Sequence, residues 1–148
     1  MPKWNTTKLL LYLHHDYGIV IVTHRCRSQG VITMQIANVN TENGIARSGG
    51  MKDIYLEILE SFLEDGNERK TDLKQSLESE NLSSYEIHAH GIKSALYIIG
   101  ADEMSQTASD LEMAAKRGDI EFIKANNDTF VESLSTLVED VQQFLEKQ

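Results

Sequence analysis

The sequence predicts an all-α protein: an up-down antiparallel four-helix bundle, preceded by a short helix and an N-terminal leader. Apolar residues recur at steps of three and four along several segments between residues 51 and 145, which is the period of a helix with one buried face. Short stretches of glycine and helix-capping residues separate these segments, and short connections favour antiparallel neighbours. The only proline is Pro2, so no proline breaks any of them.

Size and charge limit the classes of protein that remain. The chain has 148 residues, which is enough for one domain with a substantial core. Its net charge of −9 argues against binding nucleic acid, because such a surface normally carries a basic patch. The apolar runs are far too short to span a membrane, and the start of the chain lacks the apolar stretch of a secretory signal. The single Cys26 cannot form an internal disulfide, which indicates either a reducing compartment or a thiol without a role. Taken together, these features lead us to expect a cytoplasmic protein.

Residues 1–35 are assigned to a leader, separate from the helical domain of residues 36–148. Two short apolar, partly β-branched runs at 9–13 and 19–23 predict a β-hairpin, although an isolated hairpin is only marginally stable in water. The leader also contains three histidines: His14, His15 and His24. Their spacing is not that of a recognised metal site, so we expect no metal here.

The first elements after the leader are predicted from caps and periodicity. A short helix is expected from a cap at Thr41 or Asn43 to residue 46, where a pair of glycines follows. The next segment, residues 51–63, matches the helical template most closely of any in the chain. Gly66 is expected to interrupt this helix, with a weaker helical segment continuing to about residue 79.

Three further helices complete the predicted bundle. Residues 81–84 provide a turn and a cap for a helix that Gly100 ends, and residues 102–117 form the next helix before Gly118. Asp119 caps the last helix. That helix carries a stripe of eight apolar residues: Ile123, Phe130, Leu134, Leu137, Val138, Val141, Phe144 and Leu145. Burying each such side chain contributes about 1.5–3 kcal/mol, so the stripes suffice without a disulfide or a metal.

The helix predicted before Gly100 places its two histidines on different faces. Its buried stripe recurs at steps of four and three: Tyr85, Ala89, Ile92, Leu96 and Ile99. Successive helical residues rotate by roughly 100°, so His90 falls about 160° from Ile92 and points to solvent, whereas His88 leans toward the core. The two rings therefore cannot share a metal ion in a continuous helix.

An exposed imidazole in this setting is a candidate nucleophile. With an ordinary pKa of about 6.5, roughly three quarters of such rings are uncharged at pH 7. The ammonium of Lys93, one turn from His90, could contact a phosphoryl group on the ring and offset its charge. Gly91 costs about 1 kcal/mol relative to alanine in a helix interior, and Gly91 and Ser94 keep the surface low beside the ring. Periodicity alone leaves open that His90 is a solvated histidine without a role.

Three segments of the sequence carry a resemblance to a known family. Residues 89–95 read Ala-His-Gly-Ile-Lys-Ser-Ala, residues 99–101 read Ile-Gly-Ala, and residues 111–119 read Leu-Glu-Met-Ala-Ala-Lys-Arg-Gly-Asp. Together they resemble the histidine-containing phosphotransfer (HPt) domain family, and the resemblance covers about residues 36–148. Ser94 departs from the glycine that the family usually has there, which adds a hydroxyl where a partner would approach.

The resemblance implies a phosphorelay intermediate. His90 would accept a phosphoryl group from a receiver-domain phospho-aspartate and pass it to another receiver's aspartate. Lys93 and Ser94 would support the phosphoryl group. Four more residues would line the receiver-docking surface: Glu86, Ile87, Gly91 and Tyr97.

The same resemblance implies partners and no resident cofactor. The partners would be response-regulator receiver domains and a hybrid sensor histidine kinase, with the chain acting as a monomer. No Gly-rich phosphate loop, paired-cysteine motif or nucleophile elbow is present, so we expect no ATP-binding kinase site and no enzyme in the full sense. The Mg²⁺ that neutralises the phosphoryl oxygens would come from the receiver.

Two other functions remain as alternatives. The first is a helical docking module that binds a receiver or kinase domain without accepting phosphate. The second, a bundle that binds Zn²⁺ through His88 and His90, is disfavoured because the two rings lie on different faces.

Overall fold

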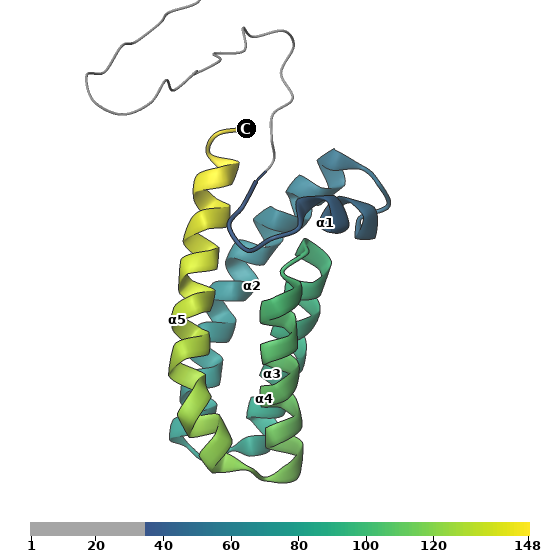
Figure 1. Ribbon diagram of the computed structural model, residues 1–148. Helices are drawn as coiled ribbons and strands as arrows, with labels where there is room; N and C mark the ends of the chain where they lie inside the picture. The colour runs from purple at the N-terminus through teal and green to yellow at the C-terminus, as the bar shows by residue number, and fades with distance from the viewer. Residues whose placement is uncertain (1–34) are drawn as a thin grey trace, which may run out of the picture. The chain divides into compact units, whose positions relative to one another are not determined.

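The computed structural model describes residues 35–148, and within that range the chain is all-α. Its five helices follow in the order α1 Thr41–Arg47, α2 Lys52–Glu78, α3 Leu82–Ile99, α4 Asp102–Arg117 and α5 Ile120–Leu145. Helices α2 to α5 run up and down as a bundle, and α1 lies across the end where α3 meets α4 (Figure 1). Residues 35–148 contain no strand, only one isolated bridge between Ile36 and Val39. The predicted β-hairpin lies outside the described residues.

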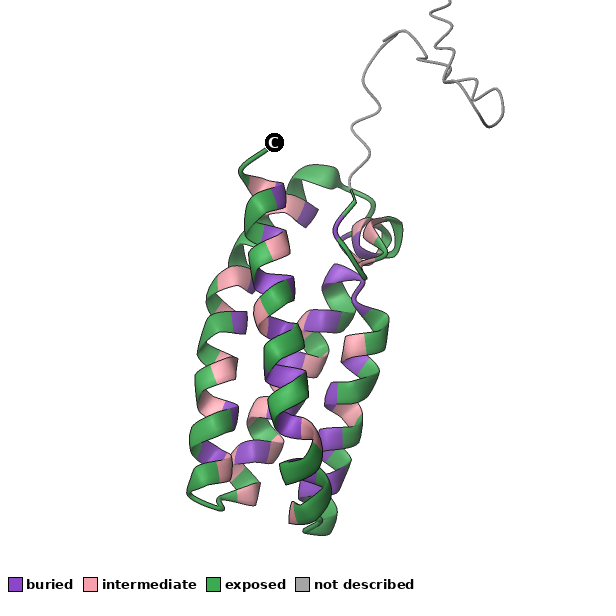
Figure 2. Cartoon of the chain, turned by 60° about the vertical axis from the view of Figure 1, so that its left-hand side comes forward, coloured by how far each residue is buried: buried purple, intermediate pink, exposed green. Residues whose placement is uncertain are grey.

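Each long helix turns one face inward, so the buried residues form stripes along the inside of the bundle (Figure 2). Two tyrosines place their hydroxyl groups in this core, and each hydroxyl has its own hydrogen-bond acceptor. Tyr55 donates to the carbonyl of Ile99 at 2.8 Å, and Tyr85 donates to Oδ1 of Asn127 at 2.8 Å. Burial raises the pKa of Tyr55 to about 12 and raises that of Tyr85 further, so both remain neutral donors.

Two details of the predicted helices were wrong. The cap of α1 is Asn40, whose side chain accepts from the backbone N–H of Asn43, rather than Thr41 or Asn43 itself. Gly66 does not interrupt α2, which is continuous from Lys52–Glu78. A Cβ atom at Gly66 would lie 2.9 Å from Cγ2 of Val138 on α5. Gly66 therefore lets two helices approach closely, and tertiary packing outweighs its low helix propensity.

Helix α1 fixes the end of α3 through close backbone contacts. Gly100 ends α3 with φ +94°, and its carbonyl oxygen accepts a hydrogen bond from the N–H of Asn40 at 2.9 Å. Arg47 places its guanidinium 3.7 Å from the centre of the Tyr97 ring and 2.8 Å from Oδ1 of Asp102. The short helix thereby joins the C-terminal end of α3 to the start of α4.

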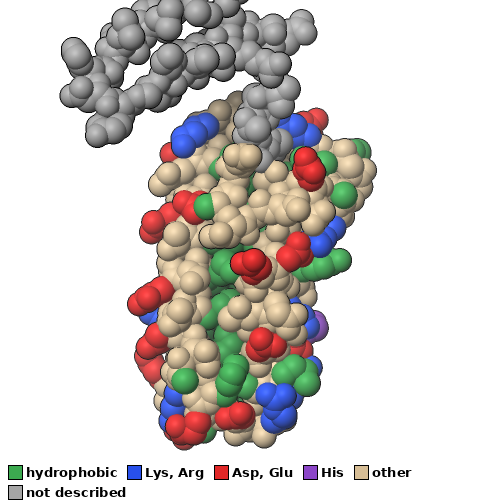
Figure 3. All heavy atoms as spheres, viewed as in Figure 1, with side chains coloured by type: hydrophobic (Ala, Val, Ile, Leu, Met, Phe, Trp, Pro, Cys, Tyr) green, Lys and Arg blue, Asp and Glu red, His purple; other side chains and the backbone are tan. Residues whose placement is uncertain are grey.

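Charged side chains are dispersed over the surface of the bundle. On the face seen in Figure 3, acidic side chains are spread along the bundle with lysine and arginine side chains among them, and apolar side chains show in the seam beside α5. No helix within residues 35–148 has the length and hydropathy needed to cross a membrane.

Candidate functional site

His90 stands on the outer face of α3, as its spacing predicts. Asn81 caps the start of this helix by accepting from the N–H of Ser84 at 3.0 Å, and Gly100 ends it in the left-handed region. The five residues of the predicted stripe are all fully buried, which fixes the rotation of the helix: Tyr85, Ala89, Ile92, Leu96 and Ile99. The His90 side chain is consequently 62% exposed, which confirms the predicted exposure.

A buried carboxylate on α4 organises the surroundings of His90. Oε1 of Glu112 lies 3.1 Å from Nδ1 of His90, and its Oε2 accepts from Nζ of Lys93 at 2.6 Å. Nζ of Lys116, one turn further along α4, donates to Oε1 at 2.6 Å. We call these four residues the Glu112 cluster. It joins α3 to α4 around a side chain that is only 4% exposed.

Neither Glu112 nor Lys116 was predicted as a site residue. A signal did exist, because Glu112 follows the buried Leu111 and lies four residues before Lys116, at the spacing of a helical ion pair. Nothing in that spacing shows, however, that the carboxylate turns toward α3 and meets His90. Only the packing of α3 against α4 brings the two side chains together.

Glu112 is ionised in this cluster. Burial alone would raise the pKa of its carboxyl group, but hydrogen bonds from Lys116, Lys93 and His90 outweigh burial and lower the pKa to about 2. Two cations and an imidazole N–H thus replace the water that the carboxylate has lost.

The lowered pKa of Glu112 predicts a specific loss of stability in acid. Its folded-state pKa lies below the ordinary value of 4.5, so its contribution is complete above about pH 4.5 and is lost as pH falls toward 2. We expect Glu112→Gln to lower the free energy of unfolding by about 2 kcal/mol at pH 6. Urea unfolding of both proteins from pH 6 to pH 2 should show the difference shrinking below pH 4.5. A difference that stayed constant down to pH 2 would contradict this assignment.

The ionised Glu112 also selects the tautomer of His90. A carboxylate can only accept hydrogen bonds, so the ring must carry its proton on Nδ1. In the neutral ring the lone pair is then on Nε2, the nitrogen that does not face Glu112. The arrangement therefore offers one defined nucleophilic atom on an exposed ring.

The two residues predicted to support phosphate already have partners. Lys93 reaches back to Glu112, and its backbone carbonyl accepts from Oγ of Ser105 at 3.0 Å. The hydroxyl of Ser94 donates to the backbone carbonyl of His90 at 3.0 Å. Lys93 thus keeps its charge beside His90, whereas the hydroxyl proton of Ser94 is used within the helix.

The four residues predicted for docking differ in their surroundings. Ile87 is 67% exposed and Tyr97 is 52% exposed, with Arg47 lying over the Tyr97 ring. Glu86 pairs with Lys116 at 3.8 Å.

The side chain of Arg69, on α2, lies against Gly91. A Cβ atom there would lie 3.2 Å from Cζ of Arg69. The absence of a side chain at Gly91 thus makes room for the guanidinium of Arg69, which the sequence did not indicate.

His88 belongs to a different cluster, on the α2 side of α3. Its Nδ1 lies 2.9 Å from Nη1 of Arg69 and 3.2 Å from Oδ2 of Asp72, and Arg69 is also bound by Asp65. This is the packing at the edge of the core that was expected for His88. Among residues 35–148, no group of three or more His, Cys, Asp and Glu side chains is arranged to hold a metal ion.

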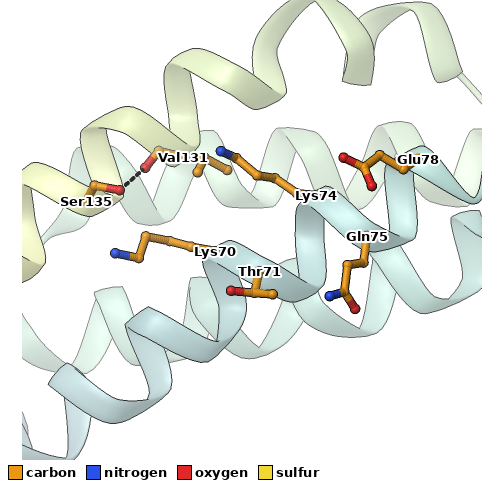
Figure 4. Close-up of a pocket in the computed structure, with 7 residues that line it drawn as sticks. All are labelled: Lys70, Thr71, Lys74, Gln75, Glu78, Val131 and Ser135. Carbon is orange, nitrogen blue, oxygen red and sulfur yellow. Dashed lines mark hydrogen bonds between the residues drawn. The ribbon is translucent and has the colours of Figure 1, made fainter.

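The surface of the bundle has shallow hollows, two of which lie along the helices α2 to α5. One, of about 540 Å³ between α3 and α4, begins at Lys93 and Ser94 and runs past Tyr97. The other, of about 430 Å³ between α2 and α5, receives the side chains of Lys70 and Lys74 (Figure 4). Only the first hollow shares residues with the surroundings of His90, so it extends the candidate site.

The sequence is similar to a known family of domains. The family described as "Hpt domain" matches residues 57–146, which is more than half of the chain. No curated protein matches the sequence.

Two solved structures share the fold. One is the HPT domain of a sensor hybrid histidine kinase from Shewanella, with 17% identity, a TM-score of 0.69, and coverage of 75% of this chain and 96% of that one. The other is histidine-containing phosphotransfer protein B from Pseudomonas aeruginosa PAO1, with 20% identity, a TM-score of 0.61, and coverage of 75% and 93%.

Proposed function

Because this chain belongs to the Hpt domain family, we propose that it is a phosphorelay intermediate that carries a phosphoryl group on Nε2 of His90. It would take this group from the phospho-aspartate of one receiver domain and pass it to the aspartate of another. The observation that carries the proposal is the contact between Nδ1 of His90 and the buried carboxylate of Glu112, on a ring that is otherwise exposed.

The transfer step follows from the state of the ring. The lone pair on Nε2 attacks the phosphorus atom, a nitrogen–phosphorus bond forms, and the bond from phosphorus to the aspartyl oxygen breaks. The aspartate leaves as a carboxylate, and positive charge develops on the imidazole. Glu112 accepts from Nδ1 throughout and stabilises this charge. The phosphoramidate and the acyl phosphate are both high in energy, so the reverse steps deliver the group to a second receiver.

Other groups have supporting roles in this proposal. Lys93 lies beside the ring and can leave Glu112 to contact the phosphoryl oxygens, because Lys116 still neutralises the carboxylate. Ser94 supports the site through its hydrogen bond to the backbone of His90. The Mg²⁺ that balances the phosphoryl charge would be held by the receiver.

The docking surface would surround His90 on α3. Ile87 and Tyr97 offer exposed apolar area on either side of the ring, and Glu86 and Gly91 complete the face. A receiver domain, or the receiver of a hybrid sensor kinase, would close over this face and exclude water from the reacting atoms.

The proposal is tested by mixing the protein with a receiver domain phosphorylated on its aspartate. We expect label to appear on this chain that is labile in acid and stable in alkali, and ¹⁵N NMR of the product should place phosphorus on Nε2 of His90. Binding of the receiver without any transfer of label would favour the docking module instead. Label on a serine or an aspartate of this chain would also contradict the proposal.

A further inference from the structure

One oxygen atom of Glu112 serves two residues at once. Oε1 accepts from Nζ of Lys116 at 2.6 Å and lies 3.1 Å from Nδ1 of His90. The ammonium and the ring nitrogen therefore both lie within hydrogen-bond distance of the same carboxylate oxygen. Lys93 occupies the other oxygen, Oε2.

The two lysines change what Glu112 does to His90. A buried carboxylate facing an imidazole with no other cation nearby would favour the protonated ring, because opposite charges attract strongly where water is excluded. A protonated ring has no lone pair on Nε2 and is not a nucleophile. Here the carboxylate of Glu112 already has two ammonium groups within hydrogen-bond distance, so a charged ring would be the third cation in contact with it.

We propose that Lys116 is a positioning residue that keeps His90 neutral while leaving its hydrogen bond to Glu112 in place. By donating to the same oxygen, Lys116 withdraws negative charge from the atom that the ring faces. Glu112 can then orient the ring and select its tautomer without holding the ring in the protonated form. This inference rests on the proposed function for its purpose, although the charge relationship itself can be measured without any phosphoryl transfer.

Other charged groups around His90 do not fill this role. Glu86, one turn before His90 on α3, lies 3.8 Å from Lys116 and carries the opposite charge. Arg69 of α2 lies against Gly91, but it is held by Asp65 and contacts neither His90 nor Glu112. Lys93 binds the oxygen that does not face the ring. Lys116 alone combines a direct contact with Oε1 and a partly exposed side chain that can be replaced without opening the core.

The test compares the wild-type protein with Lys116→Met and Lys116→Arg, using Lys124→Met as a matched control. Lys124 pairs with Glu80, away from the Glu112 cluster. NMR signals of the His90 ring are followed from pH 4 to pH 9, and the ¹⁵N shifts report the tautomer. We expect the titration midpoint of His90 to rise by roughly half a unit or more in Lys116→Met, since the positive charge that shares Oε1 of Glu112 with the ring is lost. The arginine variant and the control should titrate like wild type, and Nδ1 should stay protonated in all four proteins.

A matching change is expected in phosphotransfer. The ratio of the Lys116→Met initial rate to the wild-type initial rate should be two- to threefold lower at about pH 6 than at about pH 9, because more of the variant's rings carry a second proton at the lower pH. An unchanged or lower midpoint in Lys116→Met, or the same change in Lys116→Arg, would overturn the proposal. If wild type accepts no phosphoryl group, the proposed function fails, while the titration still decides the role of Lys116.

Discussion

Replacing His90 with glutamine is expected to abolish phosphoryl acceptance, whereas replacing His88 with glutamine should leave most of it. Glutamine can still donate toward Glu112 but has no ring nitrogen with a lone pair to attack phosphorus. His88 lies only two residues away, yet it faces Arg69 and Asp72 on the α2 side of α3. The pair of variants therefore separates the reacting ring from the general effect of losing a histidine in this helix.

The measurement is the amount of acid-labile label transferred from a phosphorylated receiver, with helix content checked by circular dichroism. Retention of the label in His90→Gln would contradict the assignment of the phosphorylated residue, as would its complete loss in a folded His88→Gln protein. His90 is largely exposed, so its replacement should change the stability of the bundle little.

Replacing Gly100 with alanine should destabilise the protein by roughly 3 kcal/mol or more, and the same change at Gly118 by about 1 kcal/mol. Both glycines end a helix with positive φ, at +94° and +72°. Their surroundings differ sharply. A Cβ atom at Gly100 would lie 2.1 Å from the backbone carbonyl oxygen of Asn40, whereas nothing lies within 4 Å of one at Gly118.

The additional cost at Gly100 comes from α1. The carbonyl oxygen of Asn40 accepts the N–H of Gly44 at 3.0 Å, so displacing it breaks the first turn of that helix. Urea unfolding of the two variants and the wild type measures the difference directly. Equal destabilisation at the two positions would mean that α1 is not seated against the end of α3.

The glycines show how far sequence reasoning reached at the helix ends. Gly100, Gly118 and Asp119 were predicted as helix boundaries and occupy those positions, because caps act within one turn of the chain. The same local rule predicted a break at Gly66, and this prediction was wrong. The glycine is there because a side chain would meet Val138 of α5. A local rule describes the cost of a glycine in a helix, but it cannot show a neighbouring helix that outweighs this cost.

Part of the candidate site could likewise be predicted from local spacing, and part could not. The exposure of His90 follows from its position relative to Ile92 and Leu96, both of which are fully buried as predicted. The contact with Glu112 could not be predicted, because the two residues are 22 positions apart and belong to different helices. Their meeting depends on the rotation and height of α4 beside α3, which no periodicity within one helix defines.

The sequence by itself determined the helical bundle, the buried stripe of α3 and the histidine that faces solvent, because all of these depend on the spacing of residues along one chain segment. Only the tertiary structure decided which nitrogen of that histidine faces Glu112, and which charged groups surround that carboxylate. Those properties arise from a carboxylate and an ammonium contributed by a second helix, and electrostatic interactions depend on distance in space rather than on distance along the chain.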